Sequence, residues 1–367
     1  MGLLANMSGT SQEIYNAFHV LLRRIRGGIG MATVGANALF ATITGVSIAS
    51  AAVFSKISLK PMMDLNYNKQ FALGTIAGSS VLGMLIPPSL LLIIYGMLAQ
   101  TSIGDLFLAG IVPGILLSFV YCVGIYVMAR FKPSLVGGST VQKYGRWTKE
   151  DVRTIVKPWG LVVLMLVVLG GIYSGYFTPT EAGGIGAFGA LLLVLAKKRF
   201  NLKGFWRVLI ETGYTTASVL FLLIAAQMYS RMLSMSGIGN LIQDMVAAIH
   251  VPDIFIILIF VAILLLLGMI LDSTSILLVT MPLMVPIVSS MGYDLIWFGI
   301  VAVIAVEMGL LTPPFGMVIF SMKSALGNQV TLEELFKGSF PFLVMMLITL
   351  LILIFIPGLV TFLPDLW

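Results

Sequence analysis

The stretch Gly83-Met84-Leu85-Ile86-Pro87-Pro88-Ser89 has a second version 226 residues later, Gly309-Leu310-Leu311-Thr312-Pro313-Pro314-Phe315. Both versions lie in the middle of long apolar segments. Proline removes a backbone donor and clashes with the preceding helical turn, and each unpaired backbone group in lipid costs several kcal/mol. Two such breaks at matching positions are typical of a carrier built from two structural repeats, with solute and coupling ions bound where the helices break.

The composition indicates a membrane protein. Of its 367 residues 59% are hydrophobic and only 10% are charged, and the mean hydropathy is +1.06. A soluble domain of this size would not carry so few charges. Several apolar runs approach or exceed the roughly 20 residues that cross a hydrocarbon core. We therefore expect a multi-pass protein of the bacterial inner membrane, in contact with the lipid bilayer.

Other functional classes have little support in the sequence. The single cysteine, Cys122, excludes an intrachain disulfide. The two histidines, His19 and His250, form no H-E-x-x-H zinc motif, and no G-x-x-x-x-G-K-[ST] loop for ATP is present. We expect no enzyme activity and no cofactor.

The repeat extends beyond the proline pairs. Three further pairs of segments correspond at shifts of 227 to 229 residues: Asn6–Gly9 with Ser234–Gly237, Gly45–Ile48 with Asp272–Ser275, and Ser102–Phe107 with Thr331–Phe336. Gly, Ser, Leu and Pro are common in membrane proteins, so one match could arise by chance. Four matches in the same order favour a true internal repeat.

Each unit predicts the same series of elements, giving an all-α polytopic membrane protein. A short helix comes first (Gln12–Leu22; Leu241–Ile249). A re-entrant hairpin follows, at about 30–57 and 255–290, whose second arm (Ile48–Phe54; Ile276–Val288) is too short to cross. A broken helix comes next, at about 71–99 and 295–325, and then a full span (Leu106–Arg130; Leu335–Leu353).

The predicted organisation has three parts. The first repeat covers 1–135, a basic cytoplasmic loop and connecting scaffold helices cover 136–228, and the second repeat covers 229–367. Three spans are expected in the connecting part, near Pro158–Phe177, Ala182–Ala196 and Phe205–Tyr229. By symmetry with the last of these, at least one further span is expected before residue 1.

The distribution of charge tests this topology. If the first hairpin enters from the cytoplasm, five crossings separate the two hairpins, so the two repeats are inverted. Twenty of the 21 Lys and Arg residues then fall inside, and only Arg231 falls outside. This pattern matches the positive-inside rule. The net charge of +6 is therefore explained by topology and anionic lipid, and not by nucleic-acid binding.

Two carboxylates stand out in the apolar segments. Asp272 follows a run of leucines at the second hairpin tip, and Glu307 lies two residues before Gly309. Intramembrane carboxylates are costly and are candidates for function. Asp272 could instead cap the following helix, and Glu307 could face a water-filled crevice or pair within the bundle.

Neutral oxygen atoms accompany these carboxylates. Hydroxyls are supplied by Ser47, Ser50, Ser273, Thr274 and Ser275, and carbonyls are freed near both proline pairs. Several such oxygens at a broken helix suit sodium, whereas the N-termini of half-helices favour an anionic solute. Any one hydroxyl could equally bond back to its own helix.

At these residues the chain resembles the large membrane (M, DctM-like) subunit of TRAP, or tripartite ATP-independent periplasmic, transporters. The signs are the paired G-x-x-x-P-P breaks, the Met7-Ser8-Gly9 entry, the basic stretch Arg23–Gly28 and Leu271-Asp272-Ser273-Thr274. The resemblance covers the whole chain. It implies an elevator-type, sodium-coupled importer of organic acids such as C4-dicarboxylates. Its partners would be a small membrane subunit (Q) and a periplasmic solute-binding protein (P).

The resemblance also implies site residues. Sodium, the coupling ion, would lie at the hairpin tips and breaks: Ser47, Gly83, Leu85 and Pro88 in one site, and Thr274, Gly309 and Thr312 in the other. The substrate would contact Asp272, Ser273, Ser50 and Pro314. Two alternatives stay open: a stand-alone sodium/dicarboxylate symporter of similar architecture, and a truncated membrane subunit that does not transport.

Overall fold

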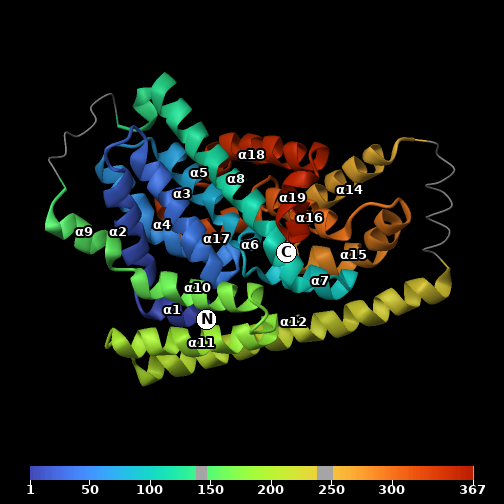
Figure 1. Ribbon diagram of the computed structural model, residues 1–367. Helices are drawn as coiled ribbons and strands as arrows, with labels where there is room; N and C mark the ends of the chain where they lie inside the picture. The colour runs from blue at the N-terminus through green and yellow to red at the C-terminus, as the bar shows by residue number, and fades with distance from the viewer. Residues whose placement is uncertain (138–146, 238–250, 367) are drawn as a thin grey trace.

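A computed structural model describes residues 1–137, 147–237 and 251–366, and these are mostly helical. Figure 1 shows the arrangement. The α-helices are α1 (Gly2–Met7), α2 (Thr10–Leu22), α3 (Gly28–Thr44), α4 (Ser47–Asp64), α5 (Lys69–Ser80), α6 (Leu82–Leu85), α7 (Leu90–Ala99), α8 (Ile103–Phe131), α9 (Lys149–Val156), α10 (Trp159–Tyr173), α11 (Pro179–Ala196), α12 (Leu202–Ser236), α14 (Asp253–Gly268), α15 (Ser273–Ser290), α16 (Leu295–Gly309), α17 (Met317–Leu326), α18 (Leu332–Phe355) and α19 (Gly358–Leu366).

Both predicted breaks are present. In the first unit α5 and α6 lead into residues 86–89, and α7 continues at an angle of 41° to the helices before it. In the second unit α16 ends at Gly309, and α17 begins only at Met317. Pro87-Pro88 and Pro313-Pro314 are both cis. The predicted helix at Leu241–Ile249 lies outside the described residues.

The prediction that each hairpin has a short second arm is wrong. The first hairpin consists of α3 and α4, and its second arm reaches Asp64 where the sequence pattern placed its end near Phe54. Polar residues continue this helix because they bond within it: Ser55 donates to the carbonyl of Ala51 and Ser58 to that of Phe54, both at 2.7 Å. In the second hairpin α15 also has 18 residues, and it is long and apolar enough to cross a membrane.

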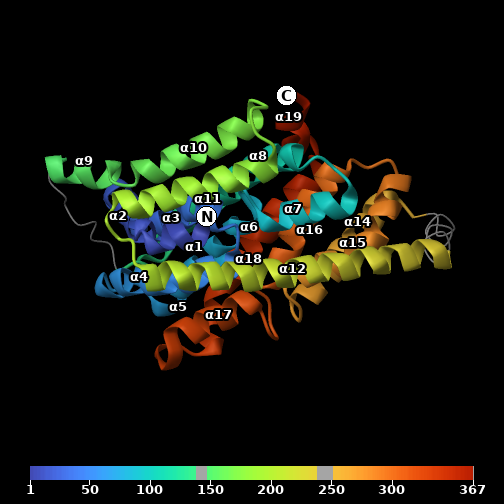
Figure 2. The same ribbon diagram turned by 90° about the horizontal axis from the view of Figure 1, so that it is seen from below.

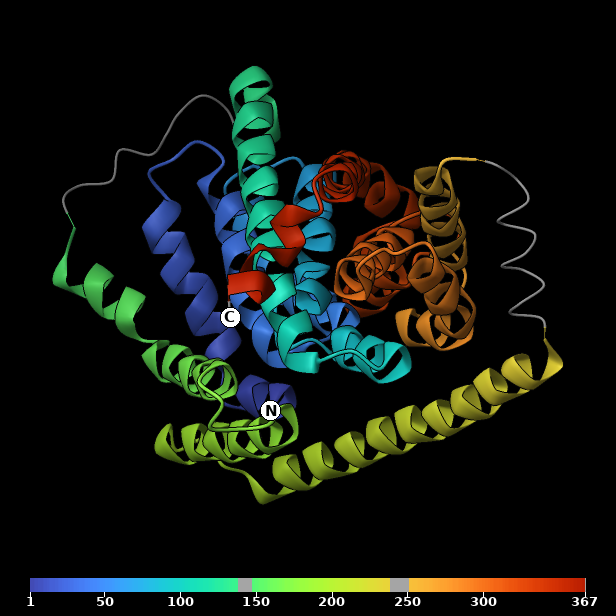
Figure 3. The same cartoon turned by 45° about the vertical axis from the view of Figure 1, so that its right-hand side comes forward.

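The two units interlock. Within each unit the first hairpin arm packs on the first half of the broken helix, α3 on α5 and α14 on α16. Across the units the second arm packs on the other unit's second half-helix, α4 on α17 and α15 on α7. Ser321 of α17 donates to the carbonyl of Ile48 at 3.1 Å, and Tyr95 of α7 donates to that of Leu295 at 2.6 Å. Figure 3 shows the resulting core of broken helices.

Helices α10, α11 and α12 lie along one side of this core (Figure 2). α12 has 35 residues, and most of its surface is exposed. Among the described residues six helices are long and apolar enough to cross a membrane, and a seventh crossing is formed if the bent α5–α7 pair counts as one span. The chain is therefore an all-α, multi-pass membrane protein.

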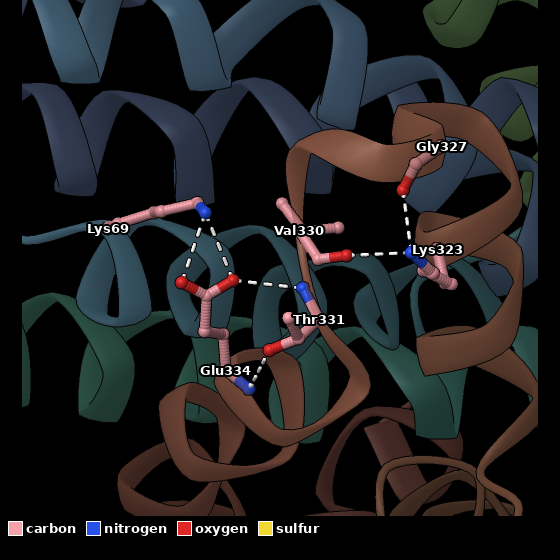
Figure 4. A network of polar contacts seen from close by, with 6 residues as sticks. All are labelled: Lys69, Lys323, Gly327, Val330, Thr331 and Glu334. Atoms are coloured by element: carbon pink, nitrogen blue, oxygen red, sulfur yellow. Dashed lines mark hydrogen bonds and ion pairs between the residues drawn. The ribbon is translucent and has the colours of Figure 1, made fainter.

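Ion pairs join segments that the charge pattern assigns to the cytoplasmic side. Arg23 binds Asp151 at 2.7 Å, and Glu13 accepts from Lys197. Figure 4 shows a third junction, in which Glu334 at the start of α18 binds Lys69 at 3.0 Å. The same carboxylate accepts from the backbone nitrogen of Thr331 at 2.9 Å, completing a capping box. Each of these pairs joins segments that lie far apart in the sequence.

Candidate functional site

A single carboxylate joins the two hairpin tips. Glu307, in the last turn of α16, is only 1% exposed. Its Oε2 accepts a hydrogen bond from the hydroxyl of Ser47, and its Oε1 accepts one from the hydroxyl of Ser273 at 3.0 Å. Ser47 and Ser273 are the first residues of α4 and α15, the second arms of the two hairpins. Glu307 therefore lies where both hairpins meet the second break.

Two helix N-termini near this carboxylate partly offset the cost of burying its charge. The N-terminus of a helix carries partial positive charge from its unpaired N–H groups, and a negative side chain there is stabilised. Two such termini, those of α4 and α15, approach Glu307 through their first residues. A carboxylate offers about four acceptor positions, and these two hydrogen bonds use only two of them.

The first hairpin tip rests on the first break. Gly45 has φ +59°, and a Cβ atom added to it would lie 3.0 Å from the carbonyl oxygen of Pro88 and 3.4 Å from the nitrogen of Leu90. Glycine is needed here, both for the left-handed backbone and for the close approach. Ser89 then caps α7, accepting from the nitrogen of Leu92 at 3.4 Å. The structure thus brings Ser47 and Pro88 to the same junction.

Gly83 and Leu85 lie beside that junction within the short helix α6. The carbonyl of Leu85 faces α8, because a Cβ atom at Gly110 would lie only 2.6 Å from it. These two predicted sodium ligands are buried in the core and belong to a helical turn. Their assignment as ligands stays a prediction.

The second tip rests on the second break in the same way. Gly268, at the end of α14, packs so closely on Gly309 that a Cβ atom at Gly309 would lie 2.5 Å from the Cα of Gly268. The backbone nitrogen of Gly316 donates to the carbonyl of Met269 at 3.4 Å. Thr312 donates to the carbonyl of Met308 at 2.8 Å, so its hydroxyl bonds to its own helix. Thr274 is half-buried beside Ser273.

Asp272 caps α15. Its Oδ2 accepts from the backbone nitrogen of Ser275 at 3.1 Å, and its Oδ1 accepts from the hydroxyl of Ser275 at 2.5 Å. The side chain is half-buried at the tip of the second hairpin, between α14 and α15, and Pro314 of the second break is exposed. A capping role is therefore present in the structure, and a substrate role for Asp272 stays a prediction.

A second polar cluster lies inside the first hairpin and was not predicted from the sequence. Ser50 donates to Oδ1 of Asn37 at 2.7 Å, and Asn37 donates through Nδ2 to the hydroxyl of Ser79 at 2.8 Å. All three residues are fully buried. The signal for it was an amide in the middle of the apolar α3. Ser50, a predicted substrate residue, thus ties α4 to α3 in this structure.

Comparison with known proteins places the chain in a family. The model of the DctM component of tripartite ATP-independent periplasmic transporters matches residues 1–359. The chain belongs to this family. It is a permease component of the inner membrane and not an enzyme, as the sequence predicted.

Three curated relatives match nearly all of this chain and most of their own length. The sialic acid TRAP transporter large permease protein SiaM of Vibrio cholerae is 32% identical over 100% of this chain and 84% of its own. The C4-dicarboxylate large permease DctM of Pseudomonas aeruginosa is 32% identical over 99% of this chain and 84% of its own. The 2,3-diketo-L-gulonate large permease YiaN of Escherichia coli is 30% identical over 100% of this chain and 84% of its own.

A solved structure supports the fold of this DctM-family chain. The YdaH transporter of Alcanivorax borkumensis superposes with a TM-score of 0.64, covering 97% of this chain and 84% of the other. At 14% identity the likeness concerns the fold alone. It agrees with the all-α polytopic architecture that the sequence predicted.

Proposed function

We propose that this chain is the membrane permease of a sodium-coupled importer of small organic acids, which works by an elevator movement of its hairpins and broken helices. The observation that carries the proposal is the convergence of both hairpin tips on Glu307. Two helix N-termini, a buried carboxylate and two hydroxyls form a site that can hold a cation and attract an anion.

Of the predicted sodium ligands, Ser47 bonds directly to this carboxylate. We propose that Pro88, which lies against Gly45 at the first tip, belongs to the same sodium site, and that Thr274, Gly309 and Thr312 form the other at the second tip and break. Sodium takes neutral oxygens and a carboxylate readily, and its charge offsets that of Glu307. We propose that Asp272 and Ser273, at the tip of the second hairpin, contact the solute.

The relatives support an acidic solute. The substrates in their names are sialic acid, C4-dicarboxylates and 2,3-diketo-L-gulonate, all of which are organic acids. We propose that the chain works with a small membrane subunit and a periplasmic solute-binding protein. We propose α12 as the contact surface for the small subunit; its Phe221, Ile224 and Met228 are all more than half exposed, as a surface facing either lipid or another subunit would be.

Uptake in proteoliposomes tests the proposal. The chain is reconstituted with the small subunit and the binding protein, and uptake of labelled sialic acid and succinate is followed with and without an inward sodium gradient. Uptake of at least one acid that needs both the gradient and the binding protein is the expected result. Uptake without the binding protein would indicate a stand-alone symporter, and uptake unaffected by sodium would contradict the coupling.

A further inference from the structure

A basic cavity opens at the end of two membrane spans that the charge pattern places on the cytoplasmic side. It has a volume of about 420 Å³ and lies between the start of α5, the end of α8 and the start of α18. Lys132 and Lys337 contribute its cationic groups, and Val127, Phe131 and Pro341 contribute its apolar wall. The site does not include any residue of the hairpin tips.

An apolar ridge on α8 leads to this cavity. Ile115, Phe119, Val123, Val127 and Phe131 follow one another at intervals of four residues, and each is more than 40% exposed. Residues four apart are neighbours on a helix surface, and at 3.6 residues per turn a row with this spacing winds around the helix by about 40° at each step. The last two members of this ridge line the cavity themselves, and Lys132 follows directly.

A second ridge begins on the other side of the cavity. In α18, Lys337 is followed by exposed Phe340, Val344 and Ile348. α8 and α18 pack against each other, and at Gly124 a Cβ atom would lie 2.0 Å from the sulfur of Met345. Because α8 ends at the cavity and α18 begins there, both apolar ridges run from the cationic end toward the membrane interior.

The charges at the cavity are only partly balanced. Lys132 makes no ion pair with any residue that the structure describes, whereas Lys337 binds Glu333 at 2.6 Å. Both side chains of that pair are more than 60% exposed, and exposed ion pairs contribute little. An ammonium group is a strong binder of phosphate, and basic pockets between spans on the cytoplasmic side suit anionic headgroups.

We propose that this cavity binds one anionic phospholipid of the inner leaflet, with its phosphate between Lys132 and Lys337 and its acyl chains along the α8 and α18 ridges. The cationic end, the cavity and the two apolar ridges together match the chemistry of a lipid better than that of a free anion, which would leave the ridges unused. The inference is independent of the transported solute.

Native mass spectrometry of the full-length chain tests the proposal through the apparent Kd of the first lipid adduct. Phosphatidylglycerol is expected to bind about tenfold or more tightly than phosphatidylcholine, since each surface lysine contributes appreciably to anionic lipid binding. The double variant Lys132→Gln, Lys337→Gln should lose that preference. Lys149→Gln with Lys203→Gln, two exposed lysines outside the cavity, is the matched control and should keep it.

Glu333→Gln supplies a test of opposite sign. It frees Lys337 from its carboxylate partner, so phosphatidylglycerol should bind more tightly, and this variant removes no residue from the cavity wall. Equal Kd values for the two lipids, an unchanged preference in the lysine double variant, or weaker binding in Glu333→Gln would each overturn the proposal. Displacement of the adduct by millimolar inorganic phosphate would indicate a free-anion site instead and would also overturn it.

Discussion

The hydroxyl of Ser273 lies 3.0 Å from Oε1 of Glu307, and this contact ties the second hairpin to the second broken helix. Ser47 of the first hairpin binds the other carboxylate oxygen, although 260 residues separate it from Glu307 in the sequence. One buried side chain therefore connects both repeats. Movement of either tip away from the second break must change the hydrogen bonding of this carboxylate.

Replacement of Glu307 by Gln tests the role of its charge. The amide keeps the size of the side chain and can still accept a hydrogen bond, but it cannot balance a cation. We expect sodium-driven uptake to fall at least tenfold, a change of about 1.4 kcal/mol, with a normal amount of protein in the membrane. Glu211→Gln, an exposed glutamate on α12, is the control and should transport normally. Normal uptake in Glu307→Gln would remove the charge from the mechanism.

The hydroxyls of Ser47 and Thr274, one at each hairpin tip, should set the sodium dependence of uptake. Ser47→Ala and Thr274→Ala each remove a proposed oxygen ligand, and loss of one buried hydrogen-bonding partner costs about 1–3 kcal/mol. We expect each variant to need several-fold more sodium for half-maximal uptake. Because the repeat duplicates the site, the wild-type sodium dependence should be cooperative. Ser55→Ala is the control, since its hydroxyl bonds only within α4. If the sodium dependence of uptake were unchanged in both Ser47→Ala and Thr274→Ala, these hydroxyls would be excluded as sodium ligands.

The inverted topology can be tested with single cysteines after Cys122 is replaced. Ser134, after α8, should face the cytoplasm, and Ser174, between α10 and α11, should face outward; both are exposed. An impermeant maleimide added to intact cells should label Ser174→Cys and leave Ser134→Cys unmodified until the cells are opened. Labelling of Ser134→Cys from outside would contradict the arrangement.

The close contact between α5 and α18 predicts a strong effect of one methyl group. A Cβ atom at Gly338 would lie 2.1 Å from the carbonyl oxygen of Gln70, and backbone cannot move aside as a flexible side chain can. Gly338→Ala should therefore lower stability by about 1–3 kcal/mol or more, seen as a lower Tm of the purified chain. Gly183→Ala, with open space around it, is the matched control and should keep the wild-type Tm.

The sequence predicted the broken helices because a proline pair inside an apolar segment has a local cost that only a break relieves. The hairpin arms were predicted less well. In the sequence, Ser55 and Ser58 indicated the end of an apolar arm. Serine can, however, donate to the carbonyl four residues earlier, and here the helix continues through both. The partners of Glu307 could not be predicted, because they depend on how α4 and α15 pack in three dimensions.

Asp272 is the residue for which capping and substrate binding must be separated. It accepts from the backbone nitrogen of Ser275, and asparagine caps a helix about as well as aspartate does. Asp272→Asn therefore keeps one oxygen to accept from the nitrogen of Ser275 and removes the charge, while its amide nitrogen can donate to the Ser275 hydroxyl. If Asp272 also contacts the solute or balances sodium, uptake should fall at least tenfold, about 1.4 kcal/mol, at normal membrane levels. Asp272→Ala removes the cap as well and should in addition lower stability by about 1 kcal/mol. Wild-type uptake by Asp272→Asn, with loss only in Asp272→Ala, would leave Asp272 as a structural cap.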